Sequence, residues 1–179
     1  LVRGWDFQQF YVAGRLVADG RAAVLYDADA FQATQRSLLP VDEQNILFFP
    51  LYPPMIGLAV APLAKLPYLA ALSIWSVLNI ACYAFACRLL ARAVGRRYRW
   101  VFILAAVGFF PLFIALRAGQ MTPILFLFLV IGLRYRSGLA LSLLACKPQL
   151  AVGTFLYFAL RRRWSVCGGM ILGGLAQAA

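Results

Sequence analysis

The feature that most restricts this 179-residue chain is the absence of negative charge after residue 43. An acid–base pair of carboxylates is therefore excluded from the later, more apolar part of the chain. A glycosidase normally needs two carboxylates that flank the bond it cleaves, so the pattern argues against that class of enzyme. The chain also contains no histidine. The acidic residues are Asp6, Asp19, Asp27, Asp29, Asp42 and Glu43.

Cysteine is scarce and shows no metal-binding pattern. The four cysteines lie inside apolar segments, without zinc-like spacing or flanking polar ligands, at Cys82, Cys87, Cys146 and Cys167. We expect buried, unpaired thiols that act as small apolar side chains. Oxygen ligands for a divalent cation are few beyond the early acidic residues, so we expect no metal and no other cofactor.

Apolar residues, by contrast, are in excess. They make up 64% of the sequence, and the mean hydropathy of +0.82 is typical of an integral membrane protein. A pI near 10.2 could indicate nucleic-acid binding. However, the arginines sit between apolar runs and form no exposed face, so we expect no nucleic-acid partner. The chain starts without Met and ends in an apolar stretch, which leads us to expect a fragment of a longer polytopic protein.

Only residues 1–50 have a composition typical of a soluble protein. Apolar residues recur there at roughly the helical period, and Gln8 and Gln9 fall largely on other faces. This predicts an amphipathic helix on the membrane surface that ends at Gly20, and a second short helix that stops at Pro40. We interpret the region as the first extracytoplasmic loop of an all-α polytopic membrane protein.

Residues 51–179 are predicted to form a single membrane domain of transmembrane helices, some of them short or broken. Residues 68–87 and 100–116 can each span the membrane, the second with a proline kink. Arginine clusters lie between these two spans and at 134–136 and 161–163. The positive-inside rule predicts that all three clusters are cytoplasmic.

Residues 137–160 should then begin and end on the cytoplasmic side. A straight helix of this length covers about 36 Å, which is enough for one crossing and not for two. We therefore predict a hairpin of two half-length helices that turns inside the membrane at the sequence CKPQ, where Pro148 favours the turn. A lysine at that depth is tolerated only in protein or beside a wet cavity, so Lys147 should face a cavity open to the outer side.

The proline-rich stretch 48–67, FFPLYPPMIGLAVAPLAKLP, leaves two topologies open. Its longest segment without proline is too short to span the membrane, which favours a re-entrant segment. The alternative is a full crossing, which would place the first arginine-rich loop outside.

The predicted cavity has the chemistry of an anion site. Lys147, Arg117, Gln120 and Gln149 supply cations and amides, which suit a lipid phosphate whose tail stays in the membrane. The alternative is that Lys147 extends to the interface and binds nothing. Asp6 lies where the loop meets the membrane, and it could act as a general base toward a hydroxyl or as a helix N-cap.

Four segments occur in an order that is known from one family. They are WDFQQFYVAGRLVADGRAAVLYD, FFPLYPPMIGLAVAPLAKLP, LRAGQMTPILFLFL and CKPQLAVGTFLYFALRRRW. Together they resemble glycosyltransferase family 87. The resemblance implies a GT-C-type bundle of transmembrane helices, with amphipathic surface helices and a catalytic aspartate in the first external loop.

By this resemblance, Asp6 is the catalytic base that takes a proton from the acceptor hydroxyl, and the sugar inverts its configuration. Lys147, with Arg117 and Gln120 nearby, would bind the phosphate of a polyprenyl-phosphate sugar, the sugar being a hexose and most simply mannose. The acceptor would be a lipid or a glycan, and the active site would lie on the extracytoplasmic side of the cell membrane. Tyr11, Tyr52 and Gln149 are candidate cavity-lining residues.

Two other classes remain open at this point. A transporter or flippase of an anionic lipid-linked substrate could also use a lysine at the midplane and broken helices. A membrane scaffold without any site is the simplest alternative. The helix expected before the first loop and the C-terminal half of the family are missing, so we expect no catalysis by this piece alone.

Overall fold

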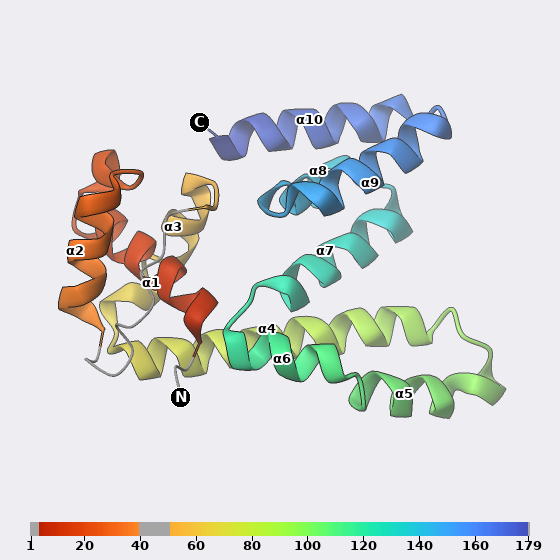
Figure 1. Cartoon of the computed structure of the whole chain (residues 1–179). Coiled ribbons are helices and arrows are strands. Elements are labelled where there is room, and N and C mark those ends of the chain that lie inside the picture. The colour runs from red at the N-terminus through yellow and green to blue at the C-terminus, as the bar shows by residue number, and fades with distance from the viewer. Residues whose placement is uncertain (1–3, 40–50, 179) are drawn as a thin grey trace. The chain divides into compact units, whose positions relative to one another are not determined.

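The computed structural model describes residues 4–39 and 51–178, and every regular element in those ranges is a helix (Figure 1). This confirms the all-α prediction for the described residues, whereas the predicted stop at Pro40 lies outside them. The elements are α1 (Trp5–Ala18), η1 (Ala22–Val24), α2 (Ala28–Leu38), α3 (Pro54–Val60), η3 (Leu63–Lys65), α4 (Tyr68–Ala91), η4 (Arg96–Tyr98), α5 (Arg99–Val107), α6 (Phe110–Ala118), α7 (Thr122–Tyr135), α8 (Gly138–Ser142), η5 (Leu143–Cys146), α9 (Pro148–Leu160) and α10 (Trp164–Ala178).

The chain forms two compact units. The first unit comprises Leu1–Val77 and Ile114–Gln120, and the second comprises Leu78–Phe113 and Met121–Ala179. Helices α4 and α6 therefore contribute residues to both units. The two units are defined by helix packing, whereas the predicted boundary at residue 50 separates an extracytoplasmic loop from a membrane domain. Packing does not test that boundary, so it remains a prediction.

Helix α1 is the core of the first unit. It occupies the predicted position, and its apolar residues pack with α2 in a cluster of Val12, Leu16 and Phe31, all fully buried. However, Gln8 and Gln9 are also buried, with exposed fractions of 0% and 6%. The sequence periodicity placed both residues away from the apolar face of the helix. It could not show that further elements cover those other faces as well.

Two glycines allow α1 and α3 to cross closely. A Cβ atom at Gly14 would lie 2.9 Å from the carbonyl carbon of Val60, and one at Gly57 would lie 3.0 Å from Val17. Only glycine lets the two backbones approach in this way. Helix α3 has 7 residues, or about 10 Å, which is too short to cross a membrane and argues against the full-crossing alternative.

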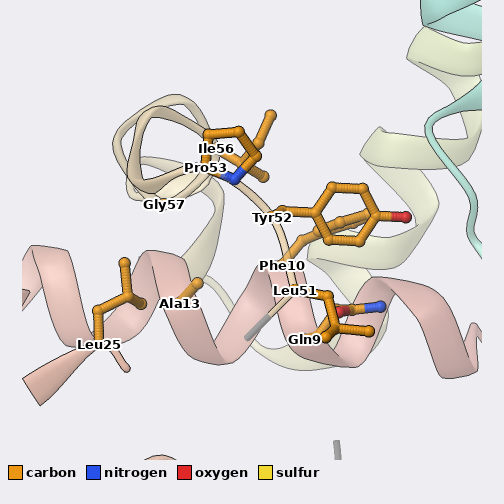
Figure 2. A pocket seen from close by; sticks show the side chains of 9 residues that line it. All are labelled: Gln9, Phe10, Ala13, Leu25, Leu51, Tyr52, Pro53, Ile56 and Gly57. Atoms are coloured by element: carbon orange, nitrogen blue, oxygen red, sulfur yellow. The ribbon is translucent and has the colours of Figure 1, made fainter. Parts of the chain in front are cut away.

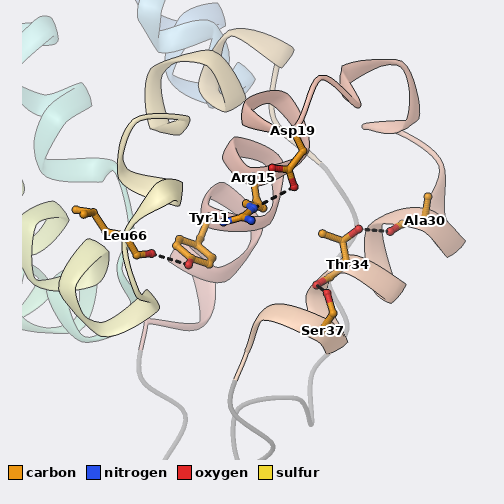
Figure 3. Close-up of polar contacts among 7 residues, drawn as sticks. All are labelled: Tyr11, Arg15, Asp19, Ala30, Thr34, Ser37 and Leu66. Atoms are coloured by element: carbon orange, nitrogen blue, oxygen red, sulfur yellow. Dashed lines mark hydrogen bonds and ion pairs between the residues drawn. The ribbon is translucent and has the colours of Figure 1, made fainter.

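One of the polar contacts in Figure 3 links α1 to the segment after η3, and the others are local to α1 and α2. The Tyr11 hydroxyl donates to the Leu66 carbonyl at 2.8 Å, and Arg15 forms an ion pair with Asp19 at 3.0 Å. Burial raises the pKa of the Tyr11 phenol, with the Arg15 charge acting in the opposite direction. The phenol therefore remains a neutral hydrogen-bond donor at neutral pH.

Two stretches in the described residues are long and apolar enough to cross a membrane. They are Tyr68–Ala91, with 24 residues, and Arg96–Ala118, with 23. The second is interrupted between α5 and α6, where Gly108 ends one helix and Pro111 lies in the first turn of the next. The proline kink predicted for this segment is therefore a break between two helices.

The second unit packs the end of α4 against α7. Ala86 and Leu89 meet Val130 in a buried cluster, and the rings of Tyr83 and Phe126 lie 5.9 Å apart. All four cysteines belong to this unit and are free, as predicted. Two of them, Cys82 and Cys87, are only partly buried.

Residues 137–160 break into a hairpin at Lys147, as predicted. Helix α8 and the turn η5 lead up to Lys147, whose φ and ψ of −130° and 89° are not helical, and Pro148 begins α9 (Figure 1). Helix α10 then packs along α8 through Gly138, where a Cβ atom would collide with the Val166 carbonyl. The hairpin is thus supported by a third helix.

Candidate functional site

Asp6 lies in the first turn of α1 and does not cap it. The cap is Gly4, whose φ of 67° and ψ of 42° are left-handed, so the N-cap alternative for Asp6 is wrong. A carboxylate in the first turn is stabilised by the helix dipole. Asp6 is partly buried, and within residues 4–39 and 51–178 its carboxylate makes no hydrogen bond or ion pair. It therefore remains able to accept a hydrogen bond.

The start of α1 is docked on the turn after α6. The Gly4 amide donates to the Arg117 carbonyl at 3.1 Å, and the Trp75 indole donates to the Gly119 carbonyl at 2.9 Å. A Cβ atom at Gly119 would lie only 2.6 Å from the Cβ of Phe7. The segment that carries Asp6 and the segment that carries Arg117 are thus in direct backbone contact within the first unit.

The turn against which the start of α1 packs is the C-cap of α6, and it has a defined geometry. Gly119 has a φ of 70°, its amide donates to the Leu116 carbonyl, and the Gln120 amide donates to the Ala115 carbonyl at 2.8 Å. This is the Schellman arrangement, which needs glycine at the left-handed position. It leaves the Arg117 side chain exposed and Gln120 partly buried.

Lys147 has a specific partner in the second unit. Its ammonium donates to the Thr122 hydroxyl at 2.7 Å, and the side chain is partly buried. A hydroxyl orients an ammonium without neutralising it, and no acidic residue occurs in the second unit. Lys147 is thus a cation held in position by a hydroxyl group. Thr122 was not identified from the sequence, because nothing there marks a residue 25 positions away as its partner.

Residues 49–179 match glycosyltransferase family 87. The chain belongs to that family. No curated protein and no solved structure matches it. This family 87 protein is therefore a glycosyltransferase, and its two long apolar stretches indicate that it resides in a membrane. The matched range contains Arg117, Gln120 and Lys147 but not Asp6, so the role of Asp6 rests on the resemblance and on its own surroundings.

The remaining candidate residues of the glycosyltransferase differ in their surroundings. Tyr11 is 4% exposed, and its hydroxyl donates a hydrogen bond to the Leu66 carbonyl. Gln149 is exposed in the first turn of α9. The Tyr52 ring meets Phe10 edge-on at 4.8 Å, and its carbonyl accepts a hydrogen bond from the Tyr26 hydroxyl.

Tyr52 also lines a small cavity beside α1 (Figure 2). Its volume is about 10 Å³, which is room for about one water molecule and far too little for a hexose. Gln9 lines the same cavity, and its buried Oε1 atom has no hydrogen-bond partner in the part of the chain that the structure describes. A buried amide oxygen without a partner lowers the stability of the fold, so its presence at Gln9 needs an explanation.

Gln9 is the second residue that the sequence did not identify. It follows Asp6 by three positions, which places both residues on one face of α1. That spacing is visible in the sequence. Only the burial of Gln9, however, distinguishes it from an ordinary solvent-exposed glutamine.

Proposed function

We propose that this protein is a GT-C-type membrane hexosyltransferase. It moves a hexose, which we propose to be mannose, from a polyprenyl-phosphate donor to a lipid or glycan acceptor. Transfer takes place on the extracytoplasmic side and inverts the anomeric configuration. Membership of family 87 supports glycosyl transfer. The identity of the donor, the sugar and the side of the membrane are our proposals.

The observation that carries the mechanism is the Asp6 carboxylate at the start of a buried helix, which has no partner among the residues that the structure describes. In the proposed step, the acceptor oxygen forms a bond to the anomeric carbon while its proton passes to Asp6. The bond between that carbon and the donor phosphate breaks, and the polyprenyl phosphate leaves with the electron pair. A positioned general base typically contributes a factor of about 10²–10⁴ to the rate.

Charge develops on the leaving phosphate, and we assign its stabilisation to Lys147, with Arg117 and Gln120. Lys147 suits this role because the Thr122 hydroxyl orients its ammonium group. Fixed charges aimed at a developing anion are often a large term in catalysis. Arg117 adds a second exposed cation.

Smaller roles follow for the residues around α1. Gln9, one turn beyond Asp6, offers an unpaired oxygen to a substrate hydroxyl or to a water that bridges to it. Tyr11, Tyr52 and Gln149 are proposed to shape the substrate cavity. A hexose needs more room than the present cavity beside Tyr52 provides.

The function is tested by following the labelled sugar. The full-length protein in lipid nanodiscs is incubated with radiolabelled polyprenyl-phosphate mannose or glucose and membrane lipids, and the products are separated by thin-layer chromatography. We expect label in a new glycolipid. If label instead crossed the bilayer of proteoliposomes without changing its carrier, the transporter alternative would hold and the proposal would fail.

A further inference from the structure

A groove of about 500 Å³ runs between α7 and α9 in the second unit. This volume lies in the usual range for small-molecule sites, roughly 300–1,000 Å³. Its walls are apolar at Leu129, Leu133 and Phe158 and polar at Arg136, Thr154 and Tyr157. The groove therefore has the character of a site for an amphiphile.

The polar side chains of the groove gather toward one end. Arg136 directly follows the last residue of α7, Tyr157 lies in the last turn of α9, and both residues line the groove. The two helices run in the same general direction (Figure 1). The Arg161 guanidinium lies over the Tyr157 ring, 5.4 Å from its centroid. Two guanidinium groups and one phenol hydroxyl are therefore available at this end, and such donors bind phosphate well.

These cations have no counter-charge inside the unit. The second unit contains ten arginines and Lys147 and no acidic residue. The C-termini of α7 and α9 carry partial negative charge, which offsets only part of it. In a membrane protein the nearest source of full negative charge is an anionic lipid headgroup.

We propose that this groove binds an anionic phospholipid. The headgroup phosphate accepts hydrogen bonds from Arg136, Arg161 and the Tyr157 hydroxyl, and one acyl chain lies along Leu129 and Leu133. The exposed fraction of Leu133 is 45%, so its side chain is open to such a chain.

This site is distinct from the proposed donor site. Lys147 precedes α9 and Arg161 follows it, and a helix of that length separates them by about 20 Å. Loss of lipid binding and loss of sugar transfer can therefore be distinguished. The proposal depends on residence in a membrane and does not depend on Asp6.

The test compares two lipids on the full-length protein by native mass spectrometry. Phosphatidylglycerol and phosphatidylcholine with identical acyl chains are titrated onto the wild type and onto Arg136→Gln/Arg161→Gln. We expect the wild type to prefer phosphatidylglycerol and the variant to bind it about thirtyfold more weakly, the contribution of two arginines near an anionic surface. Arg92→Gln/Arg97→Gln, which removes two arginines elsewhere in the unit, should keep the preference.

A milder substitution provides a second test in case the double variant does not fold. Tyr157→Phe keeps the ring beneath Arg161 and removes one donor, so it should weaken phosphatidylglycerol binding several-fold and leave phosphatidylcholine unchanged. Equal binding of the two lipids by the wild type would overturn the proposal. An unchanged preference in the double variant would do the same.

Discussion

The two units of this glycosyltransferase differ in charge. The first contains all six acidic residues and six basic ones, whereas the second contains eleven basic residues and no acidic one. The whole net charge of +11 therefore belongs to the second unit. Within this chain, a carboxylate can therefore act as a base only in the first unit, whereas the second unit is suited to binding anions.

The two units also differ in how they pack. In the first, aromatic rings surround α1: Phe7 lies 5.5 Å from Trp75 between ring centroids, and Tyr11 lies 5.3 Å from Tyr68. Glycines bring helix backbones together in both units, at Gly14 in the first and at Gly138 and Gly169 in the second, so the aromatic cluster is what distinguishes the first unit. Small residues at helix contacts are typical of packing in lipid, where apolar burial provides little driving force.

The strongest test of this comparison is removal of the proposed base. Asp6→Asn keeps the shape of the side chain and removes its charge, so transfer should fall about 10²–10⁴-fold while donor binding stays within a factor of two. The measurement is single-turnover transfer of labelled sugar by the full-length enzyme. Asp19→Asn, at the other end of the same helix, serves as the control and should transfer normally. Normal transfer by Asp6→Asn would mean that the base lies elsewhere.

The docking of α1 is tested next. Gly119→Ala combines a left-handed backbone with a collision at Phe7, so we expect a loss of about 3 kcal/mol in unfolding free energy and a fall in transfer. Gly20→Ala has the same backbone strain and open space around it, and it should cost only about 1 kcal/mol. Thermal unfolding in detergent measures both variants. Equal losses would show that the contact with Phe7 is unimportant.

A third test addresses the cation of the second unit. Lys147→Ala should weaken donor binding and transfer together by about 10- to 100-fold, the usual contribution of a hydrogen bond to a charged group. Thr122→Val removes the partner of Lys147 while keeping its size, so a several-fold loss is expected. Lys65→Ala removes an exposed lysine of the first unit and is the matched control. A Lys147→Ala enzyme with normal donor affinity would exclude Lys147 from the phosphate site.

The smallest effect is expected at Gln9. Gln9→Leu removes a buried oxygen that has no partner among the described residues, so stability should be unchanged or rise by about 1 kcal/mol. If Gln9 holds a substrate hydroxyl, KM for the acceptor should rise a few-fold while the unfolding midpoint does not fall. A variant that is destabilised with unchanged KM would show that Gln9 has only a structural role.

Much of the helical organisation could be predicted from local pattern. The helix at α1 and the interruption near Pro111 follow from periodicity and from the backbone limits of proline, which depend on neighbours within a few positions. The break at Lys147 was predicted from the arginine clusters, from the length of residues 137–160 and from Pro148. The charge asymmetry and the family motifs are likewise properties of the chain itself, which is why they were visible without any coordinates.

The contacts that make the candidate site depend on residues that are distant in sequence. Gly4 meets Arg117 across more than a hundred positions, and the ammonium of Lys147 meets Thr122 across 25. Burial of Gln9 likewise requires α3 and Tyr52 to cover α1. Local sequence propensity does not predict such contacts, because they form only when whole helices pack against one another. Residue types and helix positions could therefore be predicted from the chain, whereas the surroundings of Asp6 and Gln9 and the contact between Lys147 and Thr122 were determined by packing.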